Sequence, residues 1–271
     1  MVFEQFLEVD RVKRHVLSIA GLGVLYVGVS FLVAAYFFGR DVSVAMLFSI
    51  TILLLPSAHA LVASEEKIER RTGTRHFLRN HKDIFRTYLL LFVGILVAYI
   101  ALGLVFGDGI FTYQLGFLGA RGDITGDIAA NARGHVPTPG SVLGVATQNA
   151  IVIIIGFVLS LFFGAGALFL ITLNASVFAA FVVHVSRQVA NPAGIIGLFL
   201  IHTIPEMAGF LVASIAGGVV SRAIMKERLG SDKFRNVMKD ALVLLAIAVG
   251  IIIIAAVLEQ YGTAPLVKYV V

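Results

Sequence analysis

Residues 194–223 read GIIGLFLIHTIPEMAGFLVASIAGGVVSRA, and this stretch decides the fold. The run is about 30 residues long, or about 45 Å at the 1.5 Å rise of an α-helix, whereas the hydrocarbon core of a bilayer is about 30 Å thick. Pro205 lies inside the run, removes one helical hydrogen bond and biases Ile204 away from helical geometry. The stretch therefore predicts a membrane-embedded helix with a kink or break near Pro205.

The composition of the whole chain agrees with a membrane protein. Of 271 residues, 59% are hydrophobic and 14% are charged, whereas a soluble domain carries about 25% charged residues. This length suits one integral membrane domain over residues 1–271. The chain has no cysteine, which excludes disulfides, thiolate metal sites and cysteine nucleophiles. The net charge of +5 is carried by short segments between apolar runs, so no nucleic-acid partner is expected.

Six further apolar runs predict an all-α, polytopic membrane helix bundle of about seven spans. They cover residues 16–38, 42–63, 88–106, 151–163, 165–183 and 241–258. The run 151–163 is short, which leaves two possibilities: a re-entrant or short hairpin with the next run, or a full span that also uses residues 142–149. The longest loop, 107–141, holds an apolar patch at 111–118 that is compatible with a position on the membrane surface.

The basic residues predict an orientation. With a cytoplasmic N-terminus, the segments 11–14, 64–86 and 222–239 lie inside and hold 16 of the 21 Lys and Arg residues. Cytoplasmic loops of membrane proteins are enriched in these residues. We therefore expect a multi-pass protein of the cell membrane, with the N-terminus in the cytoplasm and the C-terminus outside.

Two ionisable side chains lie in the middle of the 194–223 run. Glu206 is costly in lipid unless it is protonated, paired or facing water. His202 precedes it by four residues, so a continuous helix puts both on one face. Asn174 lies midway in the fifth run and also needs a partner. These residues predict a buried polar centre of His202, Glu206 and Asn174, which serves either an ion-responsive site or a structural clamp.

Small residues predict close packing between helices. A stripe at four-residue spacing follows Glu206 and consists of Gly209, Ala213, Gly217 and Ser221. Such a stripe lets another helix approach closely, either within the chain or in a homo-oligomer. Gly164 and Gly166 supply the turn between the fourth and fifth runs.

Other polar residues define weaker candidates. Gln148 and Asn149 precede the short fourth run and are expected to cap it or to line an outer vestibule. A zinc enzyme needs three or four converging ligands, and the chain has no His-Glu-x-x-His element. No Gly-x-Ser-x-Gly element of a serine hydrolase is present either. The sequence therefore predicts no metal site, no catalytic residue and no cofactor.

The second half of the chain resembles the stage II sporulation protein M family, in its archaeal-type members. The resemblance covers residues 142–262 as a core that follows an N-terminal three-span part, 1–141, with its outer loop. The matching motifs are Gln148-Asn149, Phe163-Gly164-Ala165-Gly166, Leu173-Asn174, His202-Thr203-Ile204-Pro205-Glu206, Ala216-Gly217-Gly218 and Ala255-Ala256-Val257-Leu258-Glu259. The resemblance implies a multi-spanning protein with a polar core, whose sporulating relatives act with a machine that remodels the cell wall.

Three functions remain open from the sequence. The first is a non-enzymatic transport or channel-like unit, in which Glu206 titrates and water reaches it. The second is a scaffold subunit of an envelope-remodelling complex with protein partners, in which Glu206 is neutral and satisfied. The third is an intramembrane metal-dependent enzyme, which the shortage of ligands disfavours.

Overall fold

The computed structural model of the protein describes residues 16–56, 82–121, 142–163, 166–188, 191–228, 230–266 and 269–270. Within these ranges every regular element is helical, and six helices are long and apolar enough to cross a membrane. The prediction of an all-α polytopic membrane bundle is confirmed. The second predicted run appears as the shorter apolar helix Val42–Pro56, and residues 57–63 lie outside the described part.

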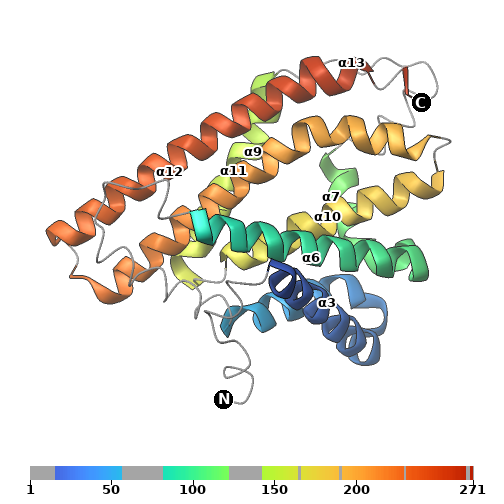
Figure 1. The fold of residues 1–271 in the computed structure, drawn as a ribbon, viewed down its shortest axis with the longest axis horizontal. Helices are drawn as coiled ribbons and strands as arrows, with labels where there is room; N and C mark the ends of the chain where they lie inside the picture. Colours follow the sequence, from blue (N-terminus) through green and yellow to red (C-terminus); the bar gives the residue numbers. More distant parts are fainter. Residues whose placement is uncertain are drawn as a thin grey trace.

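The N-terminal part packs through glycines. Helix α3 (Val16–Phe38) lies against α6 (Lys82–Phe106), and a 3-10 turn at Gly39–Asp41 leads from α3 to the helix Val42–Pro56 (Figure 1). A Cβ atom on Gly23 would lie 3.0 Å from backbone atoms of α6, and one on Gly94 would overlap the carbonyl of Ala20. These two glycines therefore allow the backbones to touch.

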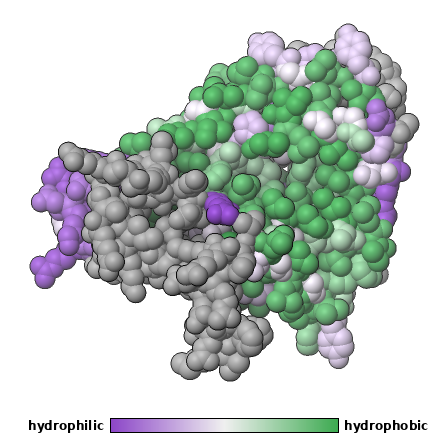
Figure 2. Space-filling model, viewed as in Figure 1, coloured by the Kyte–Doolittle hydropathy of each residue, from purple (hydrophilic) through white to green (hydrophobic). Residues whose placement is uncertain are grey.

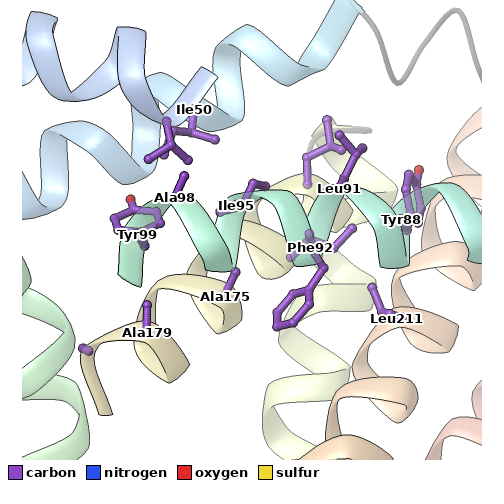
Figure 3. Close-up of a cluster of buried hydrophobic side chains, with 14 of the residues drawn as sticks. Ile50, Tyr88, Leu91, Phe92, Ile95, Ala98, Tyr99, Ala175, Ala179 and Leu211 are labelled. Atoms are coloured by element: carbon purple, nitrogen blue, oxygen red, sulfur yellow. The ribbon is translucent and has the colours of Figure 1, made fainter. Parts of the chain in front are cut away.

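Helix α10 (Gly166–Gln188) is the most buried of the six candidate spans and lies at the centre of the bundle. It contacts α6, α9 and α11. Figure 3 shows α6 between two layers, with Ile50 on one side and Ala175 and Ala179 of α10 on the other. Small alanines on α10 bring its backbone close to α6, as expected for helices packed inside a membrane.

The fourth run forms a complete helix. Helix α9 (Val142–Phe163) has 22 residues and so extends for about 33 Å. It includes the residues 142–149 that a full crossing requires, so its length favours a span over a re-entrant segment. Gly164 lies outside the described residues, and Gly166 is the first residue of α10.

Helix α11 (Pro192–Lys226) continues through Pro205, so of the kink or break predicted there, the break does not occur. Its ribbon bends along its length (Figure 1). Proline removes only one hydrogen bond of the ladder, and neighbouring helices in a membrane bundle hold the remaining turns in register. The helix begins at Asn191, whose side chain accepts a hydrogen bond from the Gly194 N–H, with Pro192 at the first helical position.

The C-terminal helix returns alongside α11. Helix α12 (Asp232–Val257) continues into the π-helical turn η4 (Leu258–Thr263) and the short helix α13 (Ala264–Leu266). Figure 1 shows α11 and α12 side by side, and both pack on α9. The Ser231 hydroxyl caps the start of α12 by accepting a hydrogen bond from the Phe234 N–H.

The segment after α6 turns back into the bundle. It forms the 3-10 turn η3 (Asp108–Phe111) and helix α7 (Thr112–Arg121), which both contact α10. Phe111, Gln114 and Leu118 are buried. One face of the apolar patch therefore packs on α10, while Tyr113 and Gly116 remain exposed at the surface of the bundle.

The surface has the distribution expected of a membrane domain. Figure 2 shows a broad apolar face, with hydrophilic residues at the end where α11 meets α12 and along the opposite edge. Exposed aromatic side chains lie near the C-terminal ends of α3, α6 and α12. They are Tyr36, Phe37, Phe38, Phe106, Tyr261 and Tyr269. Aromatic residues gather at the membrane interface, so these ends are expected to lie at one interface.

Candidate functional site: buried polar groups between the helices

His202 is buried on α11 and pairs with the π-helical turn. Its Nδ1 lies 2.8 Å from the Thr263 hydroxyl, which in turn donates to the Leu198 carbonyl at 3.3 Å. Because a hydroxyl has one proton, this arrangement assigns the proton between the two side chains to Nδ1 of His202. Nε2 is then the unprotonated nitrogen of the ring, which can accept a hydrogen bond. The ring edge also meets Phe199, with centroids 5.3 Å apart.

The π-helical turn is what brings Thr263 to His202. A π turn adds one residue to each turn and so changes the direction of the side chains that follow it. Such turns occur often at functional sites. Nothing in the sequence of residues 258–263 signals this turn, which explains why sequence reasoning missed Thr263 as the partner of His202.

Glu206 and polar residues of two other helices lie at the same end of an apolar cluster. An apolar cluster joins α9, α11 and α12 and consists of Ile153, Phe210, Ala213, Ala248 and Ile252. Asn149 precedes Ile153 by four residues, Glu206 precedes Phe210 by four, and Glu259 follows Ile252 by seven. Because α9 and α11 run in the same direction and α12 runs opposite, all three lie at the same end of the cluster.

The glycine stripe of α11 contacts α9 and α12. A Cβ atom on Gly217 would lie 2.5 Å from the Ser160 Cβ of α9, and one on Gly209 would meet Ile252 of α12 at 3.0 Å. Gly209, Ala213, Gly217 and Ser221 are all buried within the chain. The stripe is therefore occupied by helices of the same chain.

Asn174 faces a different side of α11. Its Nδ2 donates to the Leu170 carbonyl at 2.8 Å, and its side chain lines a small cavity with Met207 and Ser214. On the helical wheel these two residues of α11 are displaced from His202, which faces η4. The described contacts thus place His202 and Asn174 at separate polar positions, one on each side of α11.

A third polar group involves a residue that the sequence did not single out. Gln114 of α7 is fully buried, accepts from the Ser43 hydroxyl at 2.5 Å and donates through Nε2 to the Ser176 hydroxyl at 3.1 Å. The Tyr113 N–H also donates to Ser43. These bonds connect the helix Val42–Pro56, α7 and α10. Because the sequence indicates only a loop over residues 107–141, Gln114 carries no periodic signal there, and only the fold reveals its role.

The C-terminal end of α10 is bonded to the C-terminal end of α6 and the turn that follows it. His184 Nδ1 lies 3.0 Å from Asp108 Oδ2, and Gln188 lies 3.2 Å from the same nitrogen. Arg187 donates to the carbonyls of Gly103 and Leu104 at 3.1 and 3.0 Å. A cation at a helix C-terminus satisfies the last carbonyl groups, so Arg187 caps α6.

The remaining candidates are placed near the start of α9. Gln148 is exposed and Asn149 is buried, both in the second turn of this helix rather than at its first residue. Capping by Asn149 therefore does not occur, because the helix already begins at Val142. Within the described ranges, no three His, Cys, Asp or Glu side chains come together in a way that could hold a metal ion.

We expect Thr263→Val to destabilise the junction between α11 and η4. The substitution keeps the shape of the side chain but removes the partner of the buried His202 Nδ1. The expected loss is about 1 kcal/mol, since hydrogen bonds between membrane helices are worth about 0.6 to 1.7 kcal/mol. Unfolding by SDS in mixed micelles measures it, and Thr147→Val, on an exposed hydroxyl of α9, is the matched control. Equal stability of Thr263→Val and wild type would contradict the role assigned to this bond.

Six long apolar helices around buried polar groups define a multi-pass integral membrane protein. Residues 87–264 match the family model described as Stage II sporulation protein M. This match covers more than half of the chain, so the protein belongs to that family. The match begins in α6 and therefore includes η3 and α7, upstream of the core expected at 142–262. No curated protein and no solved structure matches the chain.

Proposed function

We propose that the protein is a non-enzymatic transport or channel-like unit for protons or small cations. The observation that carries the proposal is the buried His202, which binds Thr263 of a π-helical turn inside a membrane span and has half-buried Glu206 one turn away. Ionisable residues inside membrane spans are costly and commonly mark ion pathways or proton relays.

The chemistry of this position suits proton or cation exchange. With Nδ1 of His202 donating to Thr263, Nε2 carries no proton and is an acceptor. Glu206 lies one turn after His202 on the same side of α11. Asn149 of α9 and Glu259 of η4 lie at the same end of the apolar cluster as Glu206. Carboxylate, imidazole and amide groups on three helices provide the acceptors that a cation or a proton needs in order to pass through a membrane.

The proposed setting is the cell membrane, with the N-terminus in the cytoplasm and the C-terminus outside. This orientation rests on the excess of Lys and Arg in the segments 11–14, 64–86 and 222–239. It places the joint between α11 and α12 on the cytoplasmic side and the Asp108–His184 pair outside.

We expect Glu206→Gln to abolish ion or proton flux in proteoliposomes while leaving the protein folded. Glutamine keeps the size of the side chain and one acceptor oxygen but cannot titrate or carry charge. Flux across pH 5 to 8 is compared among wild type, Glu206→Gln and Glu227→Gln, which makes the same change outside the span at the C-terminal cap of α11. Loss in the first variant alone supports transport. Flux that is equal in all three proteins removes Glu206 from the pathway.

A scaffold in an envelope-remodelling complex is the second proposal. The observation in its favour is the length of α11, at 35 residues, or about 52 Å, which exceeds the membrane core of about 30 Å. The joint between α11 and α12 therefore extends into solvent, where partner proteins can bind. Absence of flux in wild type, together with capture of envelope proteins by cross-linkers placed at Arg228 or Lys233, would favour this function.

A further inference from the structure

A small cavity lies between α6, α10 and α11. It has a volume of about 10 Å³, and Phe92, Leu170, Asn174, Met207 and Ser214 are among the residues that line it. A cavity holds a water molecule when it accommodates about one water-sized sphere and offers two or more polar partners. The volume meets the first condition, and the second depends on the two polar side chains in its wall.

Ser214 is the first polar partner. It is 1% exposed, and its hydroxyl has no hydrogen-bond partner within the protein. Other buried hydroxyls in this bundle bond back to the carbonyl four residues earlier, as Thr51 does to Leu47 and Thr172 does to Leu168. Ser214 does not, although a buried hydroxyl without a partner is unfavourable. Ser30 and Ser160 also lack a partner, but of these three serines Ser214 alone lines this cavity.

Asn174 is the second polar partner and faces the cavity from α10. One of its amide hydrogens is used in the bond to the Leu170 carbonyl. An Asn amide has two donor hydrogens and one acceptor oxygen, so this bond leaves capacity for another partner. Asn174 is eight residues from the start of α10. Ser214 is seven residues before Ser221, where the apolar span of α11 ends, so both residues lie well inside the membrane.

We propose that this cavity binds one ordered water molecule, which bridges the Ser214 hydroxyl and the Asn174 amide and links α10 to α11. The water satisfies the unpaired hydroxyl and gives Asn174 a function in joining these helices. The inference does not depend on the proposed transport function, because an isolated structural water is sufficient for it.

Hydroxyl-radical footprinting by X-ray irradiation of the full chain in lipid nanodiscs tests the proposal. Radicals formed from a bound water oxidise the side chains beside it even where bulk water is absent, and Met207 in the cavity wall is a reactive probe. We expect Met207 to be oxidised in wild type and the rate to fall at least fivefold in Ser214→Val, which removes the hydroxyl and fills the space. Ser160→Ala is the matched control, because Ser160 is also buried without a partner but does not line this cavity.

Three results would overturn the proposal: no oxidation of Met207 in wild type, an unchanged rate in Ser214→Val, or an equal fall in Ser160→Ala. Size-exclusion chromatography and SDS unfolding establish that each variant is folded. If Ser214→Val does not fold, Ser214→Ala replaces it, and a rate within twofold of wild type then contradicts the bridge between Ser214 and Asn174.

Discussion

Gly94→Val is expected to prevent the stable packing of α3 on α6. A Cβ atom at Gly94 overlaps the backbone carbonyl of Ala20, and backbone cannot move aside as a flexible side chain can. The two helices must separate, so the contacts made by Gly23 and by the Phe31–Phe106 ring pair are weakened as well. Overpacking of a core costs about 1 to 3 kcal/mol, and a backbone overlap is expected to reach about 3 kcal/mol or more.

SDS unfolding in mixed micelles measures this effect, together with the folded fraction after detergent extraction. Gly28→Val on α3 is the matched control, because a Cβ atom at Gly28 meets no other atom within 4 Å. Both variants make the same change in helix propensity. If the two proteins were equally stable, the close approach of α3 and α6 would be wrong.

Gln114→Leu is expected to detach α7 from the bundle interior. The substitution removes the acceptor of the Ser43 hydroxyl and the donor to Ser176, at a position that is 0% exposed. Leucine is similar in size, so most of the cost comes from the two lost hydrogen bonds. The expected loss of stability is about 2 to 3 kcal/mol, at the upper end for two bonds between membrane helices.

A double-mutant cycle isolates this network. Stability is measured for Gln114→Leu, Ser176→Ala and the double variant, and a coupling energy of about 0.5 to 1.5 kcal/mol is expected because the residues contact each other. Ser186→Ala is the control on α10, since this exposed hydroxyl bonds only to the Val182 carbonyl of its own helix. Strict additivity of Gln114→Leu and Ser176→Ala would contradict the bond between them.

Hydropathy and the positions of ionisable residues were enough to predict the class of protein. Apolar runs of bilayer length require helices, because lipid offers no partner for backbone N–H and C=O groups. This constraint acts within a single segment, so the bounds expected at 16–38 agree with α3. The family motifs around Glu206 also agree with the match over residues 87–264. The sequence shows that Glu206 and His202 lie within an apolar run. Because lipid solvates ionisable groups poorly, their transfer into the membrane costs free energy.

The structural roles of polar residues outside the periodic apolar runs were not predicted from the sequence. Gln114 and Asp108 belong to a segment that the sequence indicates only as a loop, and Thr263 depends on a π turn that propensity does not encode. At Pro205, where a kink or a break was expected, α11 is bent but continuous (Figure 1), because packing on α9, α10 and α12 maintains the helix. The local sequence shows that proline removes one backbone hydrogen bond of the helix. Whether the helix continues past the proline depends on packing against neighbouring helices.

The sequence by itself thus determined that the chain crosses a membrane as helices, which family it resembles and which side chains are expensive there. Tertiary structure alone decided which partner each polar side chain meets: Thr263 for His202, Ser43 and Ser176 for Gln114, and the cavity for Asn174. The reason is that transfer into lipid depends on the composition of a single segment, whereas a hydrogen bond depends on two atoms placed within about 3 Å by different helices.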